Sequence, residues 1–79
     1  MIQEIRLTDL REGQQARVTS ILASGAMRRR LLDLGVIEGT NIICLQKSPA
    51  GDPIAFLIRG AAIALRSEDS SDIIVSMVG

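Results

Sequence analysis

The 79-residue sequence contains no histidine, tryptophan or tyrosine and only one phenylalanine, Phe56. Without histidine, the commonest base near neutral pH is missing, and neither a Ser-His-Asp nor a Cys-His arrangement can form. The shortage of aromatic side chains also removes the stacking surfaces that single-stranded nucleic acids and proline-rich peptides require. We therefore expect a protein that is not an enzyme and that binds no nucleic acid.

Cysteine and long apolar segments are scarce as well. The one cysteine, Cys44, cannot form an internal disulfide, and no apolar run is long enough to span a bilayer or to act as a signal peptide. These features predict a cytoplasmic protein without direct membrane insertion. Cys44 stands at an expected inward position of a strand, where a small thiol packs well, so we interpret it as a core residue.

Charge of one sign is not in excess, because nine basic residues balance nine acidic ones. No overall field therefore draws the chain to nucleic acid or to an anionic membrane. The phosphate-binding pattern G-x-x-x-x-G-K-[ST] is absent, and four glycines fall where turns are expected: Gly35, Gly39, Gly51 and Gly60. The length suits one small domain that covers residues 1–79.

Alternating apolar residues predict about five short strands, with one short helix between the first two. The inward positions repeat with a period of two and are Ala16, Val18 and Leu22, then Ile42 and Cys44, then Ile54, Phe56 and Ile58, then Ile63 and Leu65, and finally Ile73, Val75 and Met77. This pattern is typical of a mainly β fold, a small closed sheet. Side chains fill the interior of such a barrel and leave no ligand cavity.

Glycine and proline mark the turns between these strands. Glu38-Gly39-Thr40 leads into the second strand, and Arg59-Gly60 joins the third strand to the fourth. The prolines and the glycine of the segment 48–53 indicate a rigid reversal of the chain between the second and third strands. Its last three residues are Gly51, Asp52 and Pro53.

The helix is expected to cover residues 28–34 and to end at Gly35, because glycine reaches the left-handed conformation without a Cβ clash. Ser24 is the expected N-cap, since its hydroxyl can accept a hydrogen bond from a free backbone N–H. Residues 7–10 predict one helical turn with two apolar anchors. The polar residues 67–72 predict a loop.

One leucine of this helix lies outside the stripe that should face the core. At about 100° per residue, that stripe consists of Met27, Leu31 and Leu34. Leu32 lies between Arg28 and Arg29 and should be at least partly exposed. One interpretation is that the arginines form a solvated face and that Leu32 packs under Ile37 or an arginine stem. The other is that Leu32, ringed by guanidinium groups, anchors a partner protein.

Apolar residues also occur on the outward side of the strands, at Ile21, Ile43, Leu45, Leu57 and Ile74. The helix and the first helical turn can cover some of them, and the remainder are candidate contact surface. After the helix, Ile43 and Leu57 are the next candidates for partner binding.

The order of the motifs supports a family interpretation. RRLLDLG at 29–35 is followed by Gly39-Thr40, GDPI at 51–54, Arg59-Gly60 and IALR at 63–66. This order resembles the FeoA family, the small cytosolic components of bacterial ferrous iron transport systems. The resemblance implies an SH3-like β-barrel without a cofactor, an accessory protein of ferrous iron uptake. It also implies a partner, FeoB, the inner-membrane permease that carries a GTP-binding domain.

Two other interpretations stay open beside this one. A regulatory barrel like the C-terminal domain of DtxR-type metal-dependent repressors has a similar fold, but this sequence lacks their DNA-binding and metal-sensing domains. A direct iron carrier would use carboxylates and the thiol of Cys44, although ferrous sites favour histidine with carboxylates. The carboxylates available in the polar segment are those of Glu68, Asp69 and Asp72.

We favour modulation of FeoB through protein contacts. A barrel of 8.5 kDa without metal ligands or a nucleophile can shift the conformational equilibrium of another protein, but it cannot itself transport or hydrolyse anything. The sequence leaves open whether FeoB is activated or inhibited, and whether the chain forms a homo-oligomer.

Overall fold

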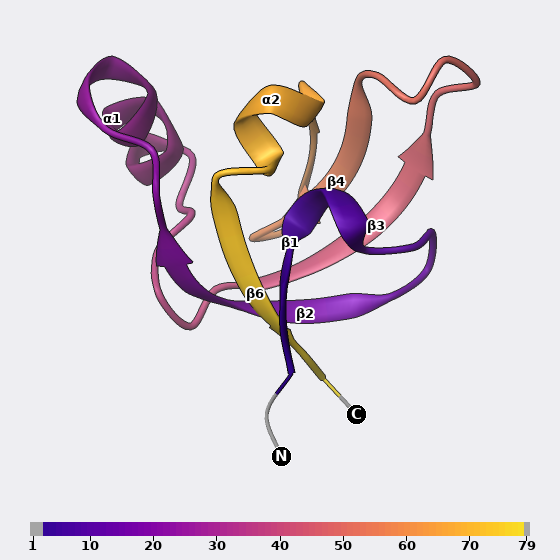
Figure 1. The fold of residues 1–79 in the computed structure, drawn as a ribbon, viewed down its shortest axis with the longest axis horizontal. Helices are drawn as coiled ribbons and strands as arrows, with labels where there is room; N and C mark the ends of the chain where they lie inside the picture. The colour runs from indigo at the N-terminus through magenta and orange to yellow at the C-terminus, as the bar shows by residue number, and fades with distance from the viewer. Residues whose placement is uncertain (1–2, 79) are drawn as a thin grey trace.

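A computed structural model describes residues 3–78. Six antiparallel strands form one curved sheet in the order β1-β6-β2-β3-β4-β5 (Figure 1). In chain order the elements are β1 (Glu4–Arg6), the 3-10 turn η1 (Leu7–Asp9), β2 (Gln15–Ile21), α1 (Gly25–Asp33), β3 (Asn41–Lys47), β4 (Ile54–Ile58), β5 (Ala61–Leu65), α2 (Ser67–Ser70) and β6 (Ile73–Met77).

The core is built from the inward strand positions that the alternation predicts. Seven of these side chains are fully buried: Ala16, Ile42, Cys44, Phe56, Ile58, Ile73 and Val75. Leu7 and Leu10 are also fully buried, and η1 contacts β6 and α2. The helical turn expected at residues 7–10 is therefore present, and it covers one end of the core.

The sheet has one strand more than the sequence predicts, because β1 precedes the expected set. Only Ile5 of its three residues is apolar, so β1 offers no alternation to recognise. It pairs with β6 through Ile5 and Val75. With β1 counted, α1 lies between the second and third strands. Within residues 3–78 the outer strands β1 and β5 stand at opposite ends of the strand order and do not pair with each other, so the barrel is open between them.

A β-bulge in β2 makes the prediction for Leu22 wrong. The register with β6 shifts between Val18 and Ser20, so one extra residue enters β2 and the side chains beyond it change faces. Ile21, expected outward, packs against the core instead, and Ala23 is buried. Leu22, expected inward, is 58% exposed.

The polar segment after β5 contains a short helix, α2, and not only the loop that the sequence predicts. Asp52 Oδ1 accepts a hydrogen bond of 2.9 Å from the backbone N–H of Ser67, the first residue of α2. Ser70 is fully buried, and its hydroxyl donates to the carbonyl oxygen of Arg66 at 3.1 Å. A side chain fifteen residues away thus supplies an acceptor that local sequence patterns do not reveal.

The two ends of α1 differ from each other in how they are capped. Ser24 has the extended backbone of an N-cap, but its side chain makes no capping hydrogen bond, so that part of the prediction is wrong. At the other end Gly35 has a φ of 92°, in the left-handed region. The N–H of Val36 donates to Leu31 O and that of Gly35 to Leu32 O, both at 2.9 Å, which is the hydrogen-bond pattern of a Schellman motif.

Candidate partner-binding site

The packing of α1 separates its leucines into a buried set and one exposed residue. Leu31 is fully buried, and Met27 and Leu34 pack partly buried against the core. Leu32 is 42% exposed, as its angular position on the helix predicts. Three apolar anchors therefore hold α1 to the barrel, and Leu32 lies outside this packed set.

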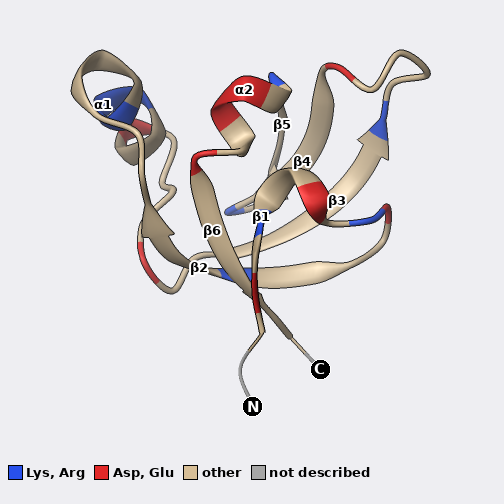
Figure 2. Ribbon diagram, in the orientation of Figure 1, with Lys and Arg blue, Asp and Glu red and all other residues tan. Residues whose placement is uncertain are grey.

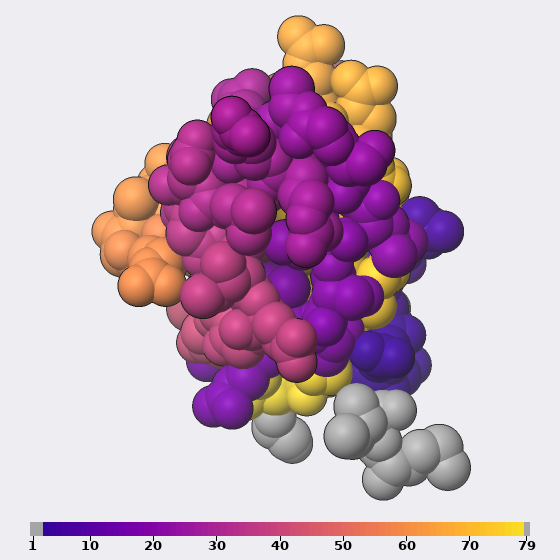
Figure 3. Space-filling model, turned by 90° about the vertical axis from the view of Figure 1, so that its left-hand side faces the viewer, coloured from indigo at the N-terminus to yellow at the C-terminus, as the bar shows by residue number. Residues whose placement is uncertain are grey.

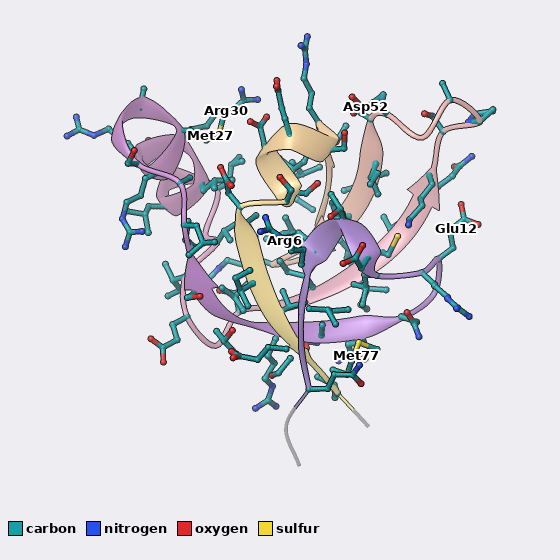
Figure 4. The ribbon with its side chains drawn as sticks, viewed as in Figure 1. Arg6, Glu12, Met27, Arg30, Asp52 and Met77 are labelled. Carbon is teal, nitrogen blue, oxygen red and sulfur yellow. The ribbon has the colours of Figure 1, made fainter. Side chains whose placement is uncertain are left out.

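The arginines beside Leu32 point in different directions. The Arg28 guanidinium donates from Nη1 to the carbonyl oxygen of Ile21 at 3.0 Å, which ties it to the end of β2. Arg30 extends from the opposite side of α1 toward α2 (Figure 4). Arg29 is exposed. Guanidinium groups therefore flank Leu32 on the outer surface of the helix.

We call Arg28, Arg29 and Leu32 the α1 face. These three residues line a shallow hollow of about 560 Å³ together with Gly25 and Asp33. Figure 3 views the molecule from the side of α1 and shows the helix and its neighbouring segments covering most of that surface. The structure thus brings the three predicted helix residues together on one accessible surface.

A second hollow, of about 340 Å³, separates α1 from the end of β2. Its lining includes Arg28 and Leu32 from α1, Ile21 from β2, and Ile37 and Glu38 from the turn after the helix. Ile37 is 46% exposed and Leu32 42%, so the two side chains do not bury each other. The apolar surface beside the α1 face is therefore larger than the sequence indicates.

Thr40 fixes the turn that carries Ile37, a role that sequence reasoning missed. The buried Thr40 hydroxyl accepts a hydrogen bond from the Ile37 N–H at 3.1 Å and donates to the carbonyl oxygen of Gly35 at 2.9 Å. The backbone of the same turn bonds to Val18 of β2 in both directions, through Gly39 N–H at 2.8 Å and Thr40 O at 2.9 Å. A threonine directly after a turn glycine was the available signal.

The strand candidates Ile43 and Leu57 form a separate surface. They are cross-strand neighbours on β3 and β4, and both are partly buried. They line a hollow of about 390 Å³ whose other lining residues include Asn41, Arg59 and Gly60. None of its lining residues lines the hollows around Leu32. The five predicted partner-binding residues therefore divide between two surfaces.

The turn residues predicted from the sequence lie in the connections between the elements that border these surfaces. Gly51 and Gly60 have φ of 85° and 83°, and among residues 3–78 Arg59 is the one non-glycine residue with a positive φ, 50°. The Arg59 side chain lies over Gly35, so that a Cβ on Gly35 would overlap its Cδ. The β4–β5 turn is thereby held against the end of α1.

The residues that could hold iron are dispersed. Residues 3–78 contain no group of three or more Cys, Asp or Glu side chains placed to share a metal ion. Cys44 is fully buried, and burial raises the pKa of its thiol, which favours the protonated form that binds metals poorly. Glu68 and Asp69 lie on the acidic helix α2, apart from Cys44 on β3 (Figure 2). Across the same residues, no helix is long and apolar enough to cross a membrane.

The fold is that of a small β-barrel of the SH3-like class. Its exposed surface includes apolar side chains around Leu32 and around Ile43 and Leu57. The FeoA domain model matches residues 5–77, and the chain belongs to the FeoA family. A curated relative is the Fe(2+) transport protein A/Fe(2+) transporter FeoB fusion protein of Porphyromonas gingivalis (strain ATCC BAA-308 / W83), 32% identical over 74 residues. That match covers 94% of this chain and 9% of the fusion protein, so the chain spans about a tenth of the relative's length.

Solved structures show the same family and fold. The solution structure of the FeoA protein from Chlorobium tepidum is 36% identical with a TM-score of 0.90, covering 95% of this chain and 71% of the other. FeoA from Stenotrophomonas maltophilia in complex with zinc, described as a prokaryotic SH3 domain protein, is 28% identical with a TM-score of 0.77, covering 95% and 88%. The IdeR protein of T. acidophilum is 22% identical with a TM-score of 0.86, covering 99% of this chain and 36% of that one, and shares the fold alone.

Proposed function

We propose that this protein is an accessory protein of ferrous iron uptake that modulates a FeoB-type permease through contacts made by its α1 face. Membership of the FeoA family supports the link to ferrous iron transport. A relative in which an Fe(2+) transport protein A and FeoB form one polypeptide supports FeoB as the partner. On this proposal the protein works at the cytosolic side of the membrane, in peripheral association with the transporter.

The observation that carries the choice of surface is the exposure of Leu32. A leucine that is 42% exposed contributes little to folding here, because Leu31 and its neighbours already anchor α1. At the centre of an interface, burial of such a side chain is worth about 1 to 2 kcal/mol or more. Arg29 beside it is free to pair with a carboxylate of the partner, since arginine is the cation favoured at interfaces.

Modulation by contact also agrees with the chemistry of the chain. Without histidine and with its one thiol buried, the protein has no evident means to carry iron or to hydrolyse a nucleotide. A binding protein can still change the partner's activity if it binds one conformation of the permease more tightly than another. This mechanism requires only a stable scaffold and one specific contact surface.

A nuclear magnetic resonance titration tests the choice of surface. The ¹⁵N-labelled protein would be titrated with the cytosolic GTP-binding domain of the FeoB-type permease from the same organism. We expect the largest amide shifts in α1, around Leu32, and in the turn at Ile37. Shifts confined to the surface of Ile43 and Leu57 would move the site to the strands, and an absence of binding to both this domain and the intact permease would refute the proposal.

Within the α1 face, Arg29 is a cleaner test position than Arg28. The Arg28 guanidinium bonds to the backbone of β2, so a change there alters the fold locally as well as the surface. Arg29→Glu reverses one exposed charge. Unlike a change at Arg28, it does not remove the hydrogen bond to the backbone of β2. We expect Arg29→Glu to weaken binding to the permease while the thermal melt stays nearly unchanged.

A further inference from the structure

The strand β5 is an open edge of the sheet. Its hydrogen-bonded neighbour is β4, and no strand pairs with its other side among residues 3–78. Figure 2 labels β5 behind the acidic helix α2. An unpaired edge presents a row of backbone N–H and C=O groups that a further strand can use.

This edge lacks the features that usually protect an edge strand from pairing. The sequence of Ala61–Leu65 is AAIAL, without a charged residue or proline, and its register with β4 is regular over all five residues. The opposite edge, β1, has only three residues, of which Glu4 and Arg6 are charged. The two edges are thus protected to very different degrees.

The turn before β5 determines which of its backbone groups face outward. Arg59 and Gly60 form a two-residue turn with φ of 50° and 83°, the geometry of a type I′ hairpin. In such a hairpin the residues flanking the turn, here Ile58 and Ala61, are a hydrogen-bonded pair, and pairs alternate from there. Ala62 and Ala64 therefore direct their N–H and C=O groups away from β4, toward solvent.

Small side chains leave these groups accessible. Ala61, Ala62 and Ala64 are all exposed. The row of cross-strand neighbours Ile43, Leu57 and Ala62 leads across β3, β4 and β5 to this edge, so a strand added there would continue an existing apolar surface. A binding segment would thus gain both backbone hydrogen bonds and apolar contacts.

Charges of both signs lie around the edge. An arginine stands near each end of β5, Arg59 in the turn before it and Arg66 directly after it, while Asp52 and the acidic residues of α2 lie near the far end. At the far end of β5 a hollow of about 330 Å³ is lined by Ala64, Arg30, Arg66 and Asp69, with Pro53 and Leu65. The Arg30 side chain extends into the space between α1 and α2 (Figure 4). Two copies paired through β5 would each bring Arg59 and Arg66 to the same interface, whereas a segment with carboxylates would complement them.

We propose that β5 is a docking edge for an extended segment of a partner protein that has small uncharged residues in its middle and carboxylates at its ends. The segment adds as a further antiparallel strand, bonded to the N–H and C=O groups of Ala62 and Ala64. This surface is distinct from the α1 face, and the inference does not depend on the identity of the protein that the α1 face binds.

Hydrogen exchange on the unaltered protein tests this directly. The probe is a nine-residue peptide with alternating valine and threonine in its five central positions and two aspartates at each end. On saturation we expect amide exchange at Ala62 and Ala64 to slow by about tenfold or more, because both N–H groups gain acceptors, while exchange at Ile63, already bonded to β4, changes little. No change at Ala62 and Ala64 up to millimolar peptide would overturn the proposal.

Two further outcomes of the same measurement without peptide would overturn it. If Ala62 and Ala64 are already protected in dilute protein, the chain itself covers the edge. If their protection rises with protein concentration, a second copy occupies it instead of a partner segment. Replacing the four aspartates by lysines should weaken peptide binding by about fivefold or more, and equal binding would refute the charge argument.

A matched pair of variants tests the backbone contact. Ala64→Pro removes the outward N–H without removing a hydrogen bond to β4, and should abolish peptide protection at Ala62. Ala64→Val keeps that N–H and favours the strand, and should preserve binding. Peptide binding that survives in a folded Ala64→Pro variant would contradict strand addition. If the proline variant does not fold, the exchange measurement on the unaltered protein decides alone.

Discussion

Gly35 is the residue at which two constraints on side-chain size coincide. Its φ of 92° disfavours any residue with a Cβ, and the Arg59 side chain occupies the place where that Cβ would lie. The first constraint follows from the sequence, because a glycine after a helical run is a common helix end. The second does not, since Arg59 comes from a turn that only the fold brings to the helix.

We predict that Gly35→Val lowers the free energy of unfolding by about 1 to 2 kcal/mol, through backbone strain and displacement of Arg59. Chemical denaturation measures the change. In an Arg59→Ala background the same substitution should cost less, because only the backbone strain remains. An unchanged denaturation midpoint for Gly35→Val would show that the end of α1 is described wrongly.

Leu31 and Leu32 are neighbours in sequence that should respond oppositely to truncation. Leu31→Ala is expected to cost about 2 to 5 kcal/mol of stability, because it leaves a cavity in a fully packed site. Leu32→Ala should change stability by no more than about 0.5 kcal/mol, as for most surface substitutions. Equal losses in the two variants would mean that Leu32 is a core residue.

At the scale of elements, the sequence predicts those strands and helix ends that local periodicity and glycine placement determine. The strands from β2 to β6, the helix α1 and its end at Gly35 follow from such patterns. The bulges do not, because an extra residue at Thr19 or Leu45 is visible only against the partner strand. For this reason the alternation alone places Leu22 on the wrong face. The edge strand β1 is not predicted for a similar reason. Its three residues are too few to show an alternating pattern, and it is recognised only by its pairing with β6.

The short helix α2 depends on a contact from another element. Asp52 Oδ1 accepts the N–H of Ser67, so Asp52→Ala leaves that group without its partner. We expect a loss of about 0.5 to 2 kcal/mol, the range for helix caps, and faster amide exchange in α2. Asp52→Asn keeps an acceptor oxygen and should lose less. If Asp52→Ala leaves the stability and exchange of α2 unaltered, the hydrogen bond does not stabilise the helix.

At the scale of the whole molecule, the SH3-like fold and the FeoA family were predictable, whereas the shape of the site was only partly so. The exposure of Leu32 follows from helix geometry. The hollow that Leu32 shares with Ile37 depends on Thr40, which holds the turn after α1 against β2. The assignment of residues 1–79 to a single domain stays a prediction. One cooperative unfolding transition seen by several probes would support it.

Metal binding is the second prediction at this scale. Because the chain has no histidine and Cys44 is buried, we expect no specific ferrous iron binding tighter than about the millimolar range of loose carboxylate sites. Anaerobic titration calorimetry with ferrous iron measures this. A stoichiometric isotherm in the micromolar range would contradict the prediction and revive the iron-carrier interpretation.

The central claim is that the α1 face binds a FeoB-type permease, and two leucines allow a matched test of it. Leu32 on α1 and Leu45 on β3 are both 42% exposed, so Leu32→Glu and Leu45→Glu make the same chemical change at equal exposure. Neither should shift the free energy of unfolding by more than about 0.5 kcal/mol. The decisive measurement is the equilibrium affinity of each variant for the purified permease of the same organism.

The account predicts that Leu32→Glu weakens this affinity by about tenfold or more, because a buried apolar contact is replaced by a charge. Leu45→Glu should stay within about twofold of the unaltered protein. A folded Leu32→Glu variant that binds the permease as tightly as the unaltered protein would contradict the account, and a loss confined to Leu45→Glu would place the interface on the strands.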